Sequence, residues 1–82
     1  MWPAVTIQAG DQQEVDCLLR ALGRAGAAPI AQAGFCVDVG GLPLGKTLKA
    51  VHECLKANGI DSVSVILSDG KKYVLSGSEP TL

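Results

Sequence analysis

The sequence predicts an α+β domain in which two helices cover one face of an antiparallel or mixed β-sheet. The first observation is an internal repeat, because the strand, helix and strand patterns of 5–30 recur about 32 residues further on, over 37–63. The second is Asp69-Gly70, which separates two alternating segments and favours the positive φ angles of a tight hairpin turn. Two strand-helix-strand units in tandem give the β-α-β-β-α-β order of the split βαβ, or ferredoxin-like, plan, and the hairpin adds one C-terminal strand.

The first strand is predicted over 3–8, where apolar and polar residues alternate and Val5 and Ile7 point toward the core. The first helix begins at Asp11, whose side-chain oxygen can accept a hydrogen bond from a free N–H group of the first turn. Glu14, three residues later, completes a capping-box pattern. The chain is therefore expected to pass from strand to helix within a few residues.

One apolar stripe defines the inner side of this helix, because residues three, four and seven positions apart share a face. Its members are Val15, Leu18, Leu19 and Leu22. Cys17 lies on the polar side, so we expect it to be exposed or to lie at an interface. Gly26 is expected to end the helix, since glycine readily takes the left-handed conformation of a helix stop.

The middle of the chain is predicted to form a hairpin. Residues 28–32 are weakly strand-like, and Pro29 limits them to a sheet edge or a strand start, because proline has no N–H for the ladder. Ala33-Gly34 is expected to turn the chain into a strand over 35–39. The inner face of that strand carries Phe35, Val37 and Val39.

The second helix is predicted over 46–58, with Asn58-Gly59 at its C-terminal end. Its inward stripe consists of Leu48, Val51 and Leu55. Strands over 62–68 and 71–76 then form the C-terminal hairpin.

The sheet face that the helices leave uncovered is predicted to carry small and polar side chains. Every second residue of each strand points to it, because successive side chains alternate between the two faces. Water or a partner could cover such a mixed surface. The residues expected at a protein interface on this face are Thr6, Cys36, Asp38, Ser64 and Ile66.

Residues 40–47, GGLPLGKT, satisfy the pattern G-x-x-x-x-G-K-[ST] between a predicted strand and a predicted helix. This loop resembles a Walker A motif. The resemblance implies that Lys46 contacts terminal phosphates, that Thr47 holds magnesium, and that N–H groups of the loop cradle phosphate oxygens. The candidate ligand-binding residues are Gly40, Gly41, Gly45, Lys46 and Thr47.

Three physical features weigh against nucleotide hydrolysis at this loop. A chain of 82 residues with two helices cannot build the multistranded parallel sheet of a P-loop NTPase. Pro43 has no N–H to offer a phosphate, and Leu44 is bulky where the backbone must approach one. Asp69, the acidic residue after an apolar strand, is already assigned to the hairpin turn. A structural loop capped at Gly45 is the simpler interpretation.

Length and composition exclude several classes of protein. We expect 1–76 to form a single domain, followed by a flexible tail at 77–82, because 82 residues suffice for one core. Seven Lys and Arg against eight Asp and Glu leave no basic excess for nucleic acid. No apolar segment reaches the roughly 20 residues of a membrane span.

The three cysteines form no C-x-x-C pair, so no structural metal site is expected. Their odd number, together with a start that lacks a leader-like pattern, favours reduced thiols and a cytoplasmic location. No catalytic residue and no cofactor is assigned, because His52 has no partner that the sequence can position.

The high apolar fraction, 48% against 18% charged residues, leaves apolar side chains outside so small a core. We therefore predict a non-enzymatic interaction or regulatory module that self-associates, with a homodimer as the expected state and a different protein partner as a further possibility. One alternative is a small protein that binds a phosphate ligand or a nucleotide through 40–47. Another is a thiol-based redox protein built on Cys17 or Cys36.

Overall fold

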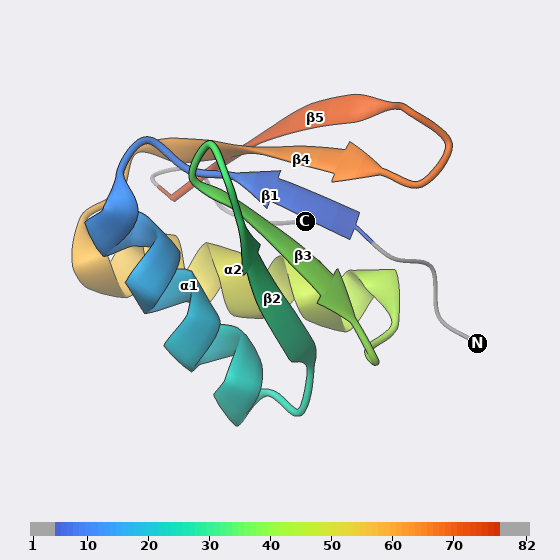
Figure 1. Ribbon diagram of the computed structural model, residues 1–82. Helices are drawn as coiled ribbons and strands as arrows, with labels where there is room; N and C mark the ends of the chain where they lie inside the picture. Colours follow the sequence, from blue (N-terminus) through green and yellow to red (C-terminus); the bar gives the residue numbers. More distant parts are fainter. Residues whose placement is uncertain (1–4, 78–82) are drawn as a thin grey trace.

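The computed structural model describes residues 5–77, in which two helices pack on one face of a five-stranded antiparallel sheet (Figure 1). The elements in chain order are β1 (Val5–Gln8), α1 (Gln12–Arg24), β2 (Ala28–Gln32), β3 (Cys36–Gly40), α2 (Leu44–Asn58), β4 (Ser62–Leu67) and β5 (Lys72–Ser76). The α+β class and the two-layer arrangement are confirmed.

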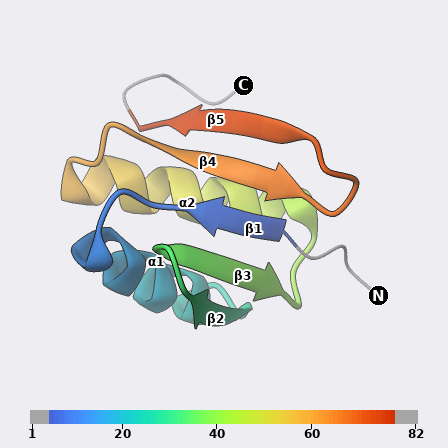
Figure 2. The ribbon, with the colours of Figure 1, turned by 45° about the horizontal axis from the view of Figure 1, so that its top comes forward.

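The strands lie side by side in the order β2-β3-β1-β4-β5, and each neighbouring pair is antiparallel (Figure 2). This order does not fully match the four-stranded ferredoxin-like order, because β5 extends the sheet beyond β4. The sheet is therefore wider than two strand-helix-strand units require. Its two outer strands are β2 and β5.

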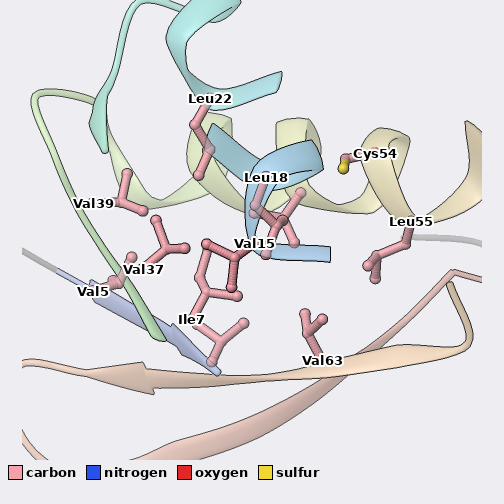
Figure 3. Close-up of a cluster of buried hydrophobic side chains, with 12 residues drawn as sticks. Val5, Ile7, Val15, Leu18, Leu22, Val37, Val39, Cys54, Leu55 and Val63 are labelled. Carbon is pink, nitrogen blue, oxygen red and sulfur yellow. The ribbon is translucent and has the colours of Figure 1, made fainter. Parts of the chain in front are cut away.

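The core lies between the sheet and the two helices, with the central strand β1 in its middle (Figure 3). Ile7 is fully buried and stands opposite Val37 on one side and Val65 on the other. The remaining buried apolar residues are Val5, Val15, Leu18, Leu22, Val39, Val51, Cys54, Leu55 and Val63. Leu19 and Leu48, both predicted to point inward, are only half-buried at the margin.

Helix α1 begins as the sequence predicts, at an N-cap formed by Asp11. The Glu14 N–H donates to Asp11 Oδ1 at 2.9 Å, and the Glu14 carboxylate accepts from the Gly10 N–H at 2.8 Å. The carboxylate thus reaches one residue further back than in a standard capping box. Beyond the helix, Gly26 has a φ of 93°, the left-handed conformation expected of the stop.

Helix α2 begins at Leu44, two residues before the predicted start at 46. Gly45 therefore lies in the first turn and does not cap the helix, which corrects the prediction. The N-cap is Pro43, which provides no side-chain cap, and its carbonyl accepts the Thr47 N–H at 3.0 Å. The predicted C-terminal end is confirmed, because Gly59 has a φ of 68°.

Phe35 is not part of β3, so its predicted place on the inner face was wrong. Gln32 pairs with Cys36, which extends the β2-β3 turn over 33–35. Phe35 takes a φ of 58° within that turn, and its side chain is 44% exposed. The prediction of β2 as an edge strand that contains Pro29 is confirmed.

The residue that follows β5, Gly77, packs against the connection between α2 and β4. The Gly77 N–H donates to the Asp61 carbonyl at 3.0 Å, and a Cβ at Gly77 would lie 2.7 Å from the Ile60 carbonyl oxygen. Only a residue without a side chain fits so close to that backbone. The rest of the predicted tail, 78–82, and the start of the predicted first strand, 3–4, lie outside the described residues.

Candidate functional site

The Walker-like loop spans the end of β3 and the start of α2. Gly40 pairs with Ala28 in the sheet, and Gly41 has a φ of 86° where a Cβ would lie 3.6 Å from the Ala28 nitrogen. Gly45 and Lys46 are exposed in the first turn of α2. The glycines thus turn the chain from the sheet into the helix.

Thr47, the residue that the resemblance assigns to magnesium, points into the protein. It is 2% exposed, and its hydroxyl donates to the Pro43 carbonyl at 3.2 Å. That hydroxyl is therefore already satisfied inside the protein, while the Lys46 side chain lies in solvent. The loop does not bring Lys46 and Thr47 around a common cavity, and ligand binding by 40–47 remains a prediction.

The predicted interface residues share the open face of the sheet. Thr6 stands between Asp38 and Ile66, and the neighbouring Gln8 stands between Cys36 and Ser64. Thr6 Oγ1 donates to Asp38 Oδ1 at 2.8 Å. The middle of the open face therefore has a polar pair that satisfies itself without a ligand.

The exposed apolar side chains of the open face lie on its two outer strands. Ile30 of β2 is 60% exposed and stands opposite Asp38. Val74 of β5 is 70% exposed and stands opposite Ser64. The sequence patterns did not predict that Ile30 and Val74 would be exposed on this face. Their exposure depends on the position of β2 and β5 at the edges of the sheet, which only the strand order shows.

The outer edge of β5 presents backbone groups to solvent. The Leu67 N–H donates to the Lys71 carbonyl at 2.8 Å, and the Gly77 N–H donates to the Asp61 carbonyl. Hydrogen-bonded and non-hydrogen-bonded pairs alternate along an antiparallel ladder. Tyr73 lies an even number of residues from both Lys71 and Gly77, so its backbone N–H and C=O groups also point toward β4. The backbone N–H and C=O groups of Lys72 and Val74 consequently point away from β4. These groups make no hydrogen bond to any other residue of 5–77.

An apolar groove, which we call the β5 groove, lies beside this edge on the helix side of the sheet. It has a volume of about 310 Å³. Its lining residues are Leu44, Leu48, Val65, Leu67, Tyr73, Val74 and Leu75. Tyr73 is 52% exposed at its mouth. Strand β5 thus combines unpaired backbone with apolar groups that water still reaches.

A second groove, the interhelical groove, lies between α1 and α2 and has a volume of about 610 Å³. Its lining residues are Cys17, Arg20, Ala21, Arg24, Ala25, Ala50, Glu53, Cys54, Ala57 and Asn58. Cys17 is half-buried in it, so its expected place on an exposed or interfacial surface is refined to this groove. The sequence did not link Cys17 with Cys54, since only the packing of the helices brings the two cysteines to one groove.

The two thiols have different surroundings. The Arg20 guanidinium donates to Cys17 Sγ at 3.7 Å, and the Asn58 amide donates to Cys54 Sγ at 3.7 Å. Burial raises the pKa of the Cys54 thiol above its ordinary value, and the nearby Cys17 raises that pKa further. Asn58 and Arg20 lower it by smaller amounts. Cys54 is thus a buried, protonated thiol beside a more accessible one.

His52 has a structural role. Its Nδ1 lies 3.2 Å from the Ser76 carbonyl oxygen. Because a carbonyl oxygen can only accept, this contact has the proton on Nδ1. The side chain joins α2 to the end of β5.

Within residues 5–77 no group of three His, Cys, Asp or Glu side chains could hold a metal ion. The same part of the chain contains no helix with both the length and the apolar character to cross a membrane. Comparisons with protein-family models, with curated proteins and with solved structures found no match for this chain. Function must therefore be inferred from the surfaces described above.

Proposed function

We propose that the protein is a non-enzymatic interaction module that self-associates as a symmetric dimer through strand β5. The observation that carries this proposal is the outer edge of β5, where the backbone groups of Lys72 and Val74 lack partners within residues 5–77. An edge with unpaired N–H and C=O groups is a template for another strand. A second copy supplies the same strand by two-fold symmetry.

One register satisfies the free groups of the edge. When Tyr73 of one copy stands opposite Tyr73 of the second copy, Lys72 of each chain pairs with Val74 of the other. All outward backbone groups of these two residues then gain partners. Ser76 is not needed, and its carbonyl stays with His52.

The β5 groove supports the same arrangement. In a continuous sheet formed by two β5 strands, the helix sides of both copies face the same way, so the two β5 grooves meet across the symmetry axis. Tyr73, half exposed in one chain, then packs on the second copy and covers Leu44 and Leu48. Covering apolar surface in this way stabilises the dimer by about 25 cal/mol per Å² of area removed from water.

We also propose a more specific fold class and a cellular location for the protein. We interpret β2-β3-β1-β4 with its two helices as a split βαβ unit, to which β5 has been added as a dimerisation strand. The internal repeat in the sequence supports this interpretation. The odd number of cysteines supports a reducing, cytoplasmic environment.

The test is the molar mass of the protein in solution, measured by light scattering at high micromolar concentration. We expect a dimer for the wild type and a monomer for Val74→Pro, because proline removes an outward N–H that β4 does not use. Tyr73→Lys is a second variant, since it places two like charges opposite each other across the axis. Both variants should keep the far-UV circular dichroism of the wild type.

The matched control is Ile30→Lys, on the open face and at the other edge of the sheet. It should remain dimeric. A monomeric wild type would overturn the proposal, as would dimers that survive both β5 variants. Loss of the dimer in Ile30→Lys alone would instead identify the open face as the interface.

A further inference from the structure

Helices α1 and α2 pack against each other, with alanines lining the groove between them. Ala21 and Ala25 of α1 and Ala50 and Ala57 of α2 are all small, so the helices approach closely and leave the interhelical groove open above them. Cys17 and Cys54 lie on the two facing helices and line this groove.

The two cysteines differ in the way that an attacking thiol and a resolving thiol must differ. Cys17 is only half-buried at the groove, so an incoming molecule can reach its sulfur. That sulfur also accepts a hydrogen bond from Arg20. Cys54 is 5% exposed and lies deeper. The third cysteine, Cys36, lies on β3 and points to the opposite face of the sheet.

We propose that the interhelical groove is a thiol-disulfide exchange site that takes an acidic, low-molecular-weight disulfide of the glutathione class. The side chains around Cys17 fit such a ligand. Arg20 and Arg24 line the groove and can pair with carboxylates, while Glu53 on the facing helix can pair with an ammonium group. A volume of about 610 Å³ accommodates a peptide-sized molecule.

The exchange proceeds in two balanced steps. First, the Cys17 thiolate attacks one sulfur of the small disulfide, which forms a mixed disulfide at Cys17 and releases one small thiolate. Second, Cys54 loses its proton to solvent and its sulfur attacks the Cys17 sulfur. This step forms the Cys17 to Cys54 disulfide and releases the second small thiolate. The protein loses two electrons, and the small disulfide gains them.

The experiment incubates the folded protein with oxidised glutathione and maps its disulfides by mass spectrometry of peptides. Cys36→Ser is the starting variant, because it removes the cysteine on the other side of the sheet. We expect this variant to lose both remaining thiols and to give one intramolecular disulfide between Cys17 and Cys54. In Cys54→Ala, the mixed disulfide at Cys17 should accumulate because nothing resolves it.

Two further variants separate this site from general thiol chemistry. Cys17→Ser should leave Cys54 unmodified, since the buried thiol is not reached directly. Arg20→Gln combined with Arg24→Gln should slow the reaction with oxidised glutathione at least tenfold and leave the reaction with uncharged hydroxyethyl disulfide unchanged.

Three results would overturn the proposal. One is a folded protein in which Cys17 and Cys54 stay reduced while the urea-unfolded chain reacts. Another is a mixed disulfide at Cys17 that persists although Cys54 is present. The third is a wild-type product in which Cys36 pairs with Cys17 or Cys54 as often as those two pair with each other.

Discussion

Side chains of α2 that carry a hydroxyl or a thiol are buried with a partner each. The Thr47 hydroxyl donates to the Pro43 carbonyl. The Asn58 side-chain amide donates to both the sulfur and the carbonyl oxygen of Cys54. Among residues 5–77 no buried side-chain nitrogen or oxygen lacks a hydrogen bond. This agrees with the high cost of leaving such groups unpaired.

The pKa of Cys54 predicts how stability changes in alkaline solution. Burial first and Cys17 second raise the pKa above its ordinary value of 9.0 in the folded protein, so the native state keeps a proton that the unfolded chain releases. The stabilising contribution is complete below pH 9.0 and is lost as the pH rises through the folded pKa. Its slope reaches at most about 1.4 kcal/mol per pH unit.

The measurement is urea unfolding under reducing conditions at pH values on both sides of 9.0, in the wild type and in Cys54→Ala. The wild type should lose more stability than the variant over this range. Titrating groups that do not interact with Cys54 contribute equally to both proteins, so the difference between the two slopes belongs to Cys54 and its interaction with Cys17. Equal slopes would contradict the prediction.

At the level of single residues, the sequence predicted best where one neighbour decides the outcome. Val5, Ile7, Val37 and Val39 were placed correctly on the inner face, because strand alternation depends on local pattern. Thr47 matches the letters of the Walker-like motif, but its side chain is buried and its hydroxyl donates to the Pro43 carbonyl. Phe35 was misplaced because the length of a turn is set by the register of two strands.

The two helices show how strongly capping determines what can be predicted. Helix α1 has Asp11 and Glu14 at its start, and its boundary was predicted correctly. Helix α2 has Pro43 as N-cap and no acidic residue in its first turn, so its sequence carries no signal for the start. The prediction accordingly placed that start two residues late.

Replacement of the α1 cap gives a direct test. Asp11→Ala removes the carboxylate that accepts the Glu14 N–H, and should lower the free energy of unfolding by about 1 kcal/mol. Gln13→Ala, an exposed position in the same first turn, should change it by less than about 0.5 kcal/mol. Chemical denaturation of both variants measures the difference, and equal effects would show that the cap is not stabilising.

The whole molecule is small, with a radius of gyration of 11.1 Å, and a single layer of side chains forms its core. The sequence predicted the class of fold from the repeat and the hairpin. It could not predict the β5 edge, the β5 groove or the interhelical groove. Each of these surfaces depends on which elements become neighbours in space, and the residues that form them are far apart in the chain.

Dimerisation predicts that thermal stability depends on protein concentration. A partner that binds the folded chain and not the unfolded chain shifts the unfolding equilibrium by mass action. The unfolding midpoint of the wild type should therefore rise as the protein is concentrated. Val74→Pro should show a lower midpoint that stays constant over the same range. A constant midpoint for the wild type, followed by calorimetry or circular dichroism, would contradict this expectation.

Pro29 gives the sheet two edges of unequal character. Pro29 lies in β2, which forms one edge of the sheet while β5 forms the other. Proline has no N–H to donate to a further strand, and β2 also packs against α1. When two copies join through β5, the outward strand at each end of the enlarged sheet is β2. In a dimer joined through β5, growth would therefore stop after one addition, which would give a closed pair and no fibre.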